Sequence, residues 1–357
     1  MPHSTSPARS LTKEEFPIID FRTVDEDPKA VAAEILDAAQ NWGFLVLKGH
    51  GVPQEDVDHM FATSSSFFNE PKEAKSEKWM NTKQQGYDYK ESVFGCTEGM
   101  CFGSIADANL TCDNLPSWWN SERRQEAEAF RSKCNELSTK LLKVFALAMG
   151  LDQEHFATAH MSGKEPGNVL RLIRYPVLTD PVDPSFPRLG EHTDWGTLTL
   201  LFTNSPGLEV QRPGGDGWVP APVIEDAVIV NIADGLALWT GGLLKSTKHR
   251  LSWESLPMNQ SRHSIAYFVN ADADAPLRVL RKEEGSDSYS ESSQSFDATF
   301  GDYQAVRMRI IHEKFDTDGT DDELKLDPKF VNLVRNIGVA HGTGVTFEGA
   351  HSTEVVA

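Results

Sequence analysis

The chain has 357 residues and a formal net charge of −19 at neutral pH. Its 39% hydrophobic and 24% charged residues are typical of a globular protein and exclude a disordered or fibrous one. So large an excess of negative charge repels phosphate backbones and anionic membrane surfaces, so we expect neither nucleic acid nor a membrane as a partner. The sequence also lacks the run of roughly 18 to 20 apolar residues that a membrane span needs.

We interpret the chain as one structural unit, because no linker in it is convincing enough to mark a domain boundary. Within that unit we expect a flexible tail, an N-terminal region of helices and strands, a β-rich catalytic core, a polar mobile loop, and a C-terminal helix with a tail. These five parts correspond to residues 1–13, 14–165, 166–280, 281–296 and 297–357.

The N-terminal region opens with a predicted strand, helix and strand. Residues 16–21 (FPIIDF) favour a short strand. Asp27 and Pro28 predict a helix start, because a carboxylate caps free N–H groups and proline fits the first helical position. Gly43 is placed to end that helix, and residues 44–52 (FLVLKGHGV) then predict a buried strand that runs into a turn.

Two further segments complete the N-terminal region. Residues 87–102 contain two glycines and two cysteines, and we expect them to form a loop over the mouth of the site. Residues 121–149 carry apolar side chains at spacings of three and four, which predicts a long amphipathic helix.

From residue 169 to residue 268 the pattern changes to short β-rich segments, separated by clusters of Gly, Pro, Asn and Asp. Short strands at such even intervals favour an all-β sandwich or barrel. Residues 281–296 are polar and poor in apolar side chains, hence the mobile loop. A last helix is predicted over about 300–314.

The four cysteines form no CxxC pattern (Cys96, Cys101, Cys112 and Cys134). A disulfide framework or a zinc site usually shows regularly spaced pairs. The N-terminus is polar and lacks the apolar run of a secretory signal peptide. We therefore expect reduced thiols in a cytoplasmic protein. Nothing in the sequence indicates the oligomeric state.

Three residues have the types and spacing of a metal site. Residues i and i+2 of a strand point to the same face, so His192 and Asp194 would present an imidazole and a carboxylate side by side. Two ligands leave a metal incomplete, and His249 on a later strand is the candidate third ligand. Two histidines and one carboxylate on one side of the metal leave positions open, as in the non-haem iron(II) oxygenases.

A second pair points to a carboxylate ligand. Arg262 and Ser264 are also two residues apart on a predicted strand, and the apolar neighbours of that strand indicate that it is buried. A guanidinium is a planar fork that binds both oxygens of a carboxylate, and an unpaired buried arginine is costly. This arginine therefore needs an anion.

At this point the sequence resembles the 2-oxoglutarate and iron(II)-dependent oxygenases of the plant and fungal type, the group that includes isopenicillin N synthase. The resemblance runs over about residues 16–315. It is carried by residues 41–53 (NWGFLVLKGHGVP), 169–176 (VLRLIRYP), 190–202 (GEHTDWGTLTLLF), 227–251 (AVIVNIADGLALWTGGLLKSTKHRL) and 262–270 (RHSIAYFVN).

The resemblance implies a double-stranded β-helix, or jelly roll, flanked by helices. It also implies that His192, Asp194 and His249 hold iron(II) and act in catalysis. Arg262 and Ser264 would bind the far carboxylate of 2-oxoglutarate, and Tyr175 would support that carboxylate.

The implied activity is that of a non-haem iron(II)/2-oxoglutarate-dependent dioxygenase, with 2-oxoglutarate and dioxygen as co-substrates. Such an enzyme oxidises an unactivated C–H bond of a small organic substrate by hydroxylation, desaturation or ring closure, here within secondary metabolism. Four residues before the barrel or near the metal are the candidates for substrate binding: Phe94, Arg171, Trp195 and Phe268.

Other functions remain open on the sequence alone. Isopenicillin N synthase itself keeps Arg-Tyr-Pro and Arg-x-Ser but uses no 2-oxoglutarate, so an iron oxidase of that kind is the runner-up. Ethylene formation from 2-oxoglutarate and a sensor that has lost turnover are further alternatives. A zinc hydrolase could use the same three ligands, but it gives no role to the Arg-x-Ser pair.

Overall fold

A computed structural model of the chain describes residues 16–92, 95–103, 113–160, 167–178, 187–215, 217–257, 259–283, 285, 289–291, 297–311, 329–331 and 334. The α-helices are α1 Pro28–Asn41, α2 Gln54–Phe68, α3 Lys72–Lys75, α4 Ser121–Ala148, α5 Glu154–Ala157, α6 Asp234–Trp239 and α7 Phe300–Ile311. The strands are β1 Ile18–Asp20, β2 Phe44–Lys48, β3 Gln85–Ser92, β4 Gly95–Phe102, β5 Val169–Tyr175, β6 Leu189–His192, β7 Leu198–Thr203, β8 Leu208–Gln211, β9 Trp218–Pro220, β10 Ala227–Ile232, β11 His249–Leu251, β12 Arg262–Val269, β13 Leu280–Lys282 and β14 Tyr289–Glu291.

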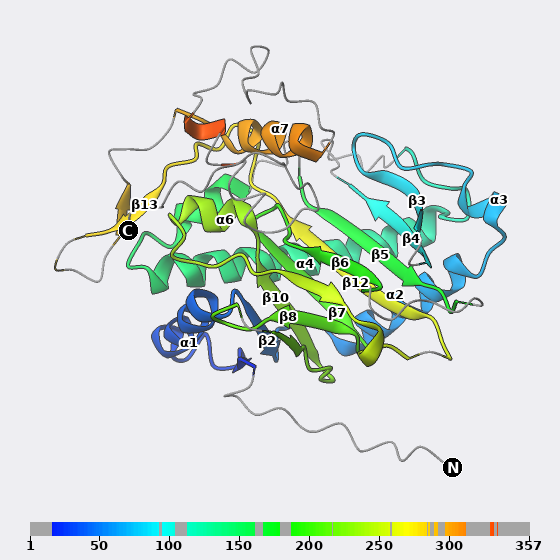
Figure 1. Cartoon of the computed structure of the whole chain (residues 1–357), viewed down its shortest axis with the longest axis horizontal. Coiled ribbons are helices and arrows are strands. Elements are labelled where there is room, and N and C mark those ends of the chain that lie inside the picture. Colours follow the sequence, from blue (N-terminus) through cyan, green and yellow to red (C-terminus); the bar gives the residue numbers. More distant parts are fainter. Residues whose placement is uncertain are drawn as a thin grey trace.

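Two β-sheets pack against each other at the centre of the molecule (Figure 1). The larger sheet has the order β1-β2-β10-β7-β12-β5-β4-β3, and the smaller has the order β6-β11-β8-β9. Phe44, Tyr175 and Ile229 of the large sheet share an apolar cluster with Val210 and Leu251 of the small sheet. The predicted β core flanked by helices is therefore confirmed.

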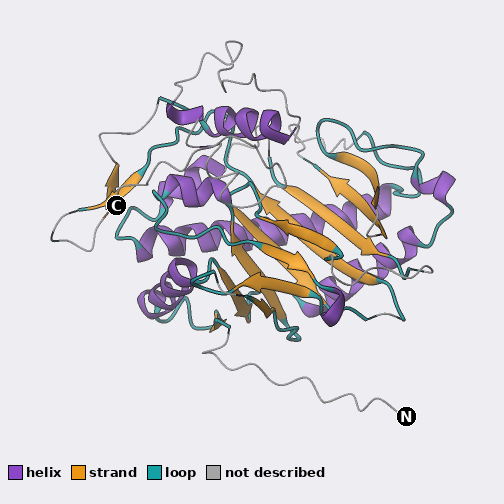
Figure 2. Cartoon of the chain, viewed as in Figure 1, coloured by secondary structure: helices purple, strands orange, loops and turns teal. Residues whose placement is uncertain are grey.

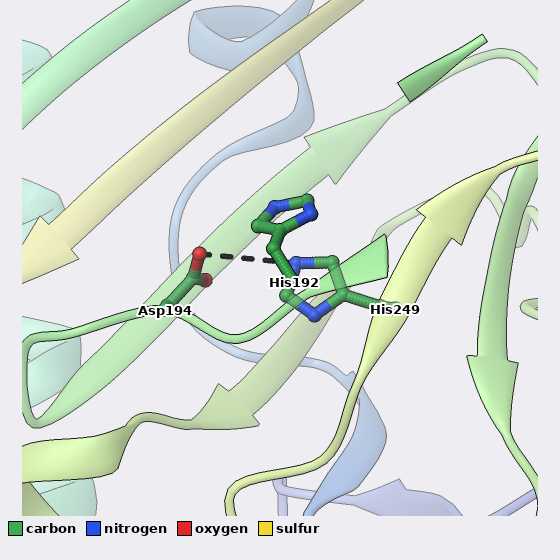
Figure 3. Close-up of side chains that lie close together, drawn as sticks. All are labelled: His192, Asp194 and His249. Atoms are coloured by element: carbon green, nitrogen blue, oxygen red, sulfur yellow. Dashed lines mark ion pairs between the residues drawn. The ribbon is translucent and has the colours of Figure 1, made fainter. Parts of the chain in front are cut away.

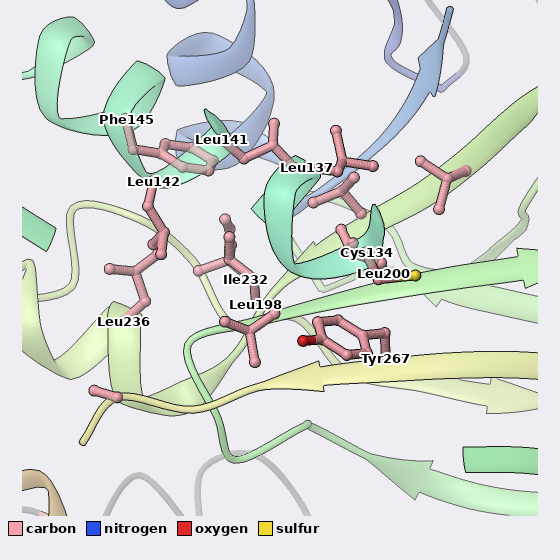
Figure 4. Close-up of a cluster of buried hydrophobic side chains, with 14 of the residues drawn as sticks. Cys134, Leu137, Leu141, Leu142, Phe145, Leu198, Leu200, Ile232, Leu236 and Tyr267 are labelled. Atoms are coloured by element: carbon pink, nitrogen blue, oxygen red, sulfur yellow. The ribbon is translucent and has the colours of Figure 1, made fainter. Parts of the chain in front are cut away.

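The helices cover the outer face of the large sheet (Figure 2). Side chains alternate along each strand, so Leu198 and Leu200 of β7 point to the helices while Thr199 points between the sheets. Helix α4 supplies much of the opposing surface. Figure 4 shows Leu141 and Phe145 of α4 among the buried side chains around β7. The central strands of the large sheet thus have one apolar face against the helices and the opposite face toward the small sheet, where the site lies.

The opening strand, helix and strand form as predicted. Asp27 caps α1, because its Oδ1 accepts a hydrogen bond from the Ala30 backbone N–H at 3.1 Å. Pro28 occupies the first helical position. Gly43 adopts a φ of 66°, and a Cβ at that position would lie 2.2 Å from the carbonyl oxygen of Lys245. The predicted long helix is also confirmed, as α4.

The expectation of a loop over residues 87–102 is wrong. Residues 87–92 and 95–102 belong to β3 and β4, an antiparallel pair that extends the large sheet, with Gln85 opposite Phe102. Tyr87 and Phe102 are buried against the helices, which gives the hairpin an apolar face and makes it part of the core. Glycines in this segment had suggested irregular structure, but they sit within paired strands.

The C-terminal expectations are met only in part. Within the segment predicted as a loop, β13 and β14 pair as an antiparallel ladder with Leu280 opposite Glu291. The last predicted helix is present as α7, and residues 312–314 of that prediction lie outside the described residues. The same holds for residues 1–13 and for Cys112. Among the described residues, Cys96, Cys101 and Cys134 are free thiols. None of the helices in the described ranges is long and apolar enough to cross a membrane.

Candidate metal centre and co-substrate site

His192, Asp194 and His249 converge between the two sheets (Figure 3). His192 ends β6 and His249 begins β11, and the two residues are directly opposite each other in the antiparallel ladder. Their ring centroids lie 4.2 Å apart. The Nε2 atom of His249 is 3.8 Å from Oδ1 of Asp194, and one possible ligand atom from each residue lies within 4.8 Å of the others. The spacing leaves room for one metal ion shared by all three side chains.

Backbone carbonyls orient both imidazoles. Nδ1 of His192 lies 2.9 Å from the carbonyl oxygen of Gly190, and Nδ1 of His249 lies 3.3 Å from that of Thr247. A carbonyl can only accept, so these contacts favour the proton on Nδ1 of each ring. Nε2 then keeps its lone pair, which is the form of histidine that binds a metal.

The carboxylate of Asp194 is held from the neighbouring large sheet. Its Oδ2 accepts hydrogen bonds from Thr199 Oγ1 of β7 at 2.7 Å and from Asn231 Nδ2 of β10 at 2.8 Å. Both donors lie on the strand faces between the sheets. Because one oxygen is fixed in this way, Oδ1 is left to face His249.

The charges at this site suit a divalent cation. Burial opposes ionisation of Asp194, but His249 and His192, with the hydrogen bonds from Thr199 and Asn231, lower its pKa overall. Burial and the neighbouring His192 lower the pKa of His249 to about 4, so its ring is neutral at pH 7. Two imidazoles and one carboxylate on one side are the donor set of non-haem iron(II) sites that keep coordination positions open. The three residues therefore fit iron(II).

Arg262 and Tyr175 lie at the end of the neighbouring strands. Arg262 of β12 is directly opposite Tyr175 of β5, and its guanidinium carbon lies 5.7 Å from the centre of the tyrosine ring. Nε of Arg262 donates to the carbonyl oxygen of Pro206 at 3.0 Å. The side chain is only 3% exposed, and in the described part of the chain no carboxylate pairs with it. Burial lowers its pKa, which is the cost of leaving this charge without an anion.

Ser264 lies on the same face of β12 as Arg262, as the spacing predicted. Thr203 of β7 is opposite Ser264, and its hydroxyl accepts a hydrogen bond from Arg262 Nη2 at 3.3 Å. A cavity of about 20 Å³ adjoins this group. It is lined by Tyr175, Pro176, Val177, Leu178, Arg188, Trp253, Leu256, Pro257, Gln260 and Arg262. A buried guanidinium with a hydroxyl group beside it fits a carboxylate ligand.

Two of the four candidate substrate residues face the space between the sheets. Phe268 lies on the same face of β12 as Arg262 and is half-buried beside Thr199. Arg171 of β5 is on the face that also carries Tyr175, and its guanidinium pairs with Asp88 of β3. Its Nε has no hydrogen-bond partner among the described residues.

The other two candidates differ. The ring of Trp195 packs under the guanidinium of Arg307 at 5.1 Å, toward α7. Phe94 lies outside the described residues. Arg174, the neighbouring cation on β5, points to the helix side and pairs with Glu98.

Sequence reasoning missed several residues around this site. Thr199 and Asn231 hold Asp194, and each could have been found by its place among apolar residues on a strand face. Arg188 is 3% exposed, lies over the rings of Tyr175 and Trp253, and donates to the Cys96 carbonyl. No local signal marked it, because its role depends on the β3–β4 hairpin folding beside β5.

Two family models match the chain and together cover more than half of it. The model for the N-terminal part of non-haem dioxygenases in morphine synthesis matches residues 16–99, and that for the 2OG-Fe(II) oxygenase superfamily matches residues 166–271. The second range contains all three candidate metal ligands.

Relatives and solved structures agree with the family models. A UPF0676 protein of Schizosaccharomyces pombe is 34% identical and matches 76% of this chain and 86% of its own. The 2-oxoglutarate-dependent dioxygenase tropC of Talaromyces stipitatus is 29% identical over 80% of this chain and 95% of its own. The crystal structure of a full-length Neurospora crassa protein in complex with alpha-KG and 5-formyluracil superposes with a TM-score of 0.68, at 29% identity, over 80% of this chain and 96% of that one. The chain belongs to the 2-oxoglutarate/iron(II) oxygenase superfamily and is a non-haem dioxygenase of the jelly-roll fold that uses iron(II), 2-oxoglutarate and dioxygen.

Proposed function

We propose that this enzyme oxidises an unactivated C–H bond of a small organic substrate, with iron(II) held by His192, Asp194 and His249. The observation that carries the proposal is the pairing of an oriented two-histidine, one-carboxylate set with a buried arginine that lacks a carboxylate partner among the described residues. A metal site alone fits several chemistries. Arg262 is an anion receptor, and a metal site with an anion receptor near it fits a keto-acid co-substrate.

In this proposal each group of residues has a separate task. Arg262, with Ser264 and the Thr203 hydroxyl nearby, binds the far carboxylate of 2-oxoglutarate, and Tyr175 supports it. Bound iron(II) would activate dioxygen, which is the oxidant: two of its four oxidising equivalents would convert 2-oxoglutarate to succinate and carbon dioxide, and the other two would oxidise the substrate. The protein supplies position and excludes water, so the direction in which the substrate is held decides among hydroxylation, desaturation and ring closure.

The proposed substrate site lies on the strand faces next to the metal. Phe268 offers an apolar surface beside Thr199, and Arg171 with Asp88 offers a donor and an acceptor farther along the sheet. This combination suits a small molecule with one apolar part and one polar group. The 5-formyluracil bound in the similar Neurospora crassa structure is a small polar ring, and it supports a small-molecule substrate without identifying it. We place the reaction in secondary metabolism.

The test is an anaerobic titration of the iron(II)-loaded protein with 2-oxoglutarate. A keto acid that chelates iron(II) gives a weak visible metal-to-ligand charge-transfer band, so the wild type should develop that band. His192→Ala should lose it, and Arg262→Ala should need a much higher 2-oxoglutarate concentration. Arg212→Ala is a matched control, because Arg212 is exposed and follows directly after β8.

Each outcome has a definite meaning. If iron binds and no band develops, the assignment of Arg262 and its neighbours to 2-oxoglutarate binding fails. The result then favours an iron oxidase of the isopenicillin N synthase kind. If the band develops in His192→Ala as in the wild type, the ligand assignment is wrong. Headspace gas analysis of the aerobic reaction separates ethylene formation from oxidation of a second substrate.

A further inference from the structure

Helix α7 reaches the loop that carries the aspartate ligand. This loop, residues 193–197, connects β6 to β7, and we call it the metal loop. Tyr303 and Arg307 are four residues apart on α7, so they share one face of the helix. They are 0% and 1% exposed, although both carry polar groups. In Figure 1, α7 lies above α6 and to its right.

Tyr303 fixes the backbone on one side of the ligand. Its hydroxyl donates a hydrogen bond to the carbonyl oxygen of Trp195 at 2.9 Å, and Trp195 follows Asp194 in the chain. The guanidinium of Arg307 covers the ring of the same tryptophan. Two side chains of one helix face therefore hold one residue of the metal loop, by its backbone and by its side chain.

Arg307 reaches the other side of the ligand through Asp234. Nη2 of Arg307 is 2.9 Å from Oδ2 of Asp234, and the same oxygen accepts a hydrogen bond from Thr193 Oγ1 at 3.0 Å. Thr193 stands between His192 and Asp194 in the sequence. The backbone N–H of Asp234 also donates to the carbonyl of Asp194 at 2.9 Å. Asp234 is thus a bridge between α7 and the residues on either side of the ligand.

The packing leaves little room for this loop to move. Gly235 follows the bridging aspartate at the start of α6, and a Cβ there would lie 2.6 Å from a ring carbon of Phe300 and 2.7 Å from the carbonyl oxygen of Gly196. The start of α6 is therefore in close contact with both helix α7 and the metal loop. A shift of α7 must be transmitted to the loop, because well-packed interiors deform little.

We propose that Tyr303 and Arg307 are positioning residues that set the coordinates of Asp194 and thereby the metal affinity of the site. The proposal rests on the metal ligands assigned under the proposed function. A buried ion pair is weak support for stability as such, since its desolvation offsets its attraction. Here the pair and the tyrosine hydroxyl instead converge on one loop, and that loop carries a ligand.

The first experiment compares Tyr303→Phe with Tyr267→Phe in the metal-free protein. Each change removes one buried hydroxyl, and the Tyr267 hydroxyl hydrogen-bonds Asn168 at 3.0 Å, outside the metal loop. Mn²⁺ affinity is measured by the loss of the free-ion EPR signal, and stability by urea unfolding without metal. We expect Tyr303→Phe to bind Mn²⁺ about tenfold more weakly, since outer partners of metal ligands commonly have effects of about 10- to 100-fold. Tyr267→Phe should bind it as the wild type does.

A second variant tests the bridge without leaving a buried charge alone. Arg307→Met combined with Asp234→Asn removes both charges at once, and we expect weaker Mn²⁺ binding at an unchanged urea midpoint. Wild-type Mn²⁺ affinity in both Tyr303→Phe and this double variant would overturn the proposal. His192→Ala serves as the reference: if it too binds Mn²⁺ normally, the ligand assignment fails, which is a different result from failure of the positioning role.

Discussion

At the scale of single residues, the Oδ1 atom of Asn231 lowers the stability of the fold, and the role of this residue in the metal site explains why it is present. It is 4% exposed, its Nδ2 donates to Asp194, and its Oδ1 has no hydrogen-bond partner among the described residues. A buried acceptor left without a donor costs about 1–3 kcal/mol. We infer that the amide is kept for what it donates to the carboxylate.

This gives a prediction of separate effects on stability and metal affinity. Asn231→Leu should change the free energy of unfolding of the metal-free protein little, because removal of the unsatisfied oxygen offsets the hydrogen bond that Asp194 loses. The same variant should bind Mn²⁺ about 10- to 100-fold more weakly, because Asp194 loses one of the two donors that orient it. Urea unfolding and EPR titration measure the two quantities. Loss of stability together with normal affinity would show that Asn231 is a packing residue.

Arg262 supports a second prediction at this scale. Its guanidinium is a planar fork, and charge-assisted hydrogen bonds contribute about 1.5–3 kcal/mol each. Arg262→Lys keeps the charge but loses the fork, so we expect the KM for 2-oxoglutarate to rise by about 10- to 100-fold, with a larger rise for Arg262→Met. Succinate release at varied 2-oxoglutarate concentration measures this KM. An unchanged KM in Arg262→Met would show that Arg262 does not bind the co-substrate.

At the scale of elements, the β3–β4 hairpin is attached to the core by a buried charge cluster. Glu98 of β4 is 3% exposed and accepts hydrogen bonds from Lys75 at 2.5 Å, from Tyr87 at 2.6 Å and from Arg174 at 2.6 Å. The cluster joins α3, β3, β4 and β5. It thereby fixes the hairpin that also carries Asp88, the partner of Arg171.

Removing the centre of this cluster should be costly. Glu98→Ala leaves the buried Lys75 and the half-buried Arg174 without their anion, and we expect the free energy of unfolding to fall by about 3–5 kcal/mol. The matched control is Lys140→Ala, whose ion pair with Asp25 joins side chains that are 42% and 79% exposed. Exposed pairs contribute about 1 kcal/mol or less, so equal losses in the two variants would contradict the role of Glu98.

At the scale of the whole molecule, buried neutral histidines make stability depend on pH. Burial lowers the pKa of His160 and of His263 to about 4, well below the ordinary value of 6.5. Between these values the unfolded chain binds protons that the folded chain does not. Stability is therefore fully present above about pH 6.5 and is lost as the pH falls toward 4.

Urea unfolding of the metal-free protein at about pH 7.5 and about pH 5.0 checks this expectation. Each of these histidines contributes about 2 kcal/mol to the difference. His160→Gln should reduce the loss between the two pH values, because glutamine does not titrate. If His160→Gln keeps the full pH dependence of stability, then groups other than His160 cause that dependence.

Much of the fold could be predicted from the sequence because its signals are local. Asp27 and Pro28 at a helix start act through their own neighbours, as does the three-and-four spacing of α4. The hairpin of β3 and β4 escaped prediction for the complementary reason. Its apolar face, with Tyr87 and Phe102, is defined by helices that are distant in the chain.

The site divides in the same way. The sequence by itself determined the types of chemistry present, and the period of two placed Arg262 and Ser264 on one face of β12. That period did not place Asp194, because β6 ends at His192 and the aspartate lies in the metal loop. Only the tertiary structure decided that His249 lies opposite His192 and that Thr199 and Asn231 hold Asp194. The tertiary structure also decided that α7 contacts the metal loop. Such pairings depend on strand register and helix packing between distant segments, and no local pattern contains that information.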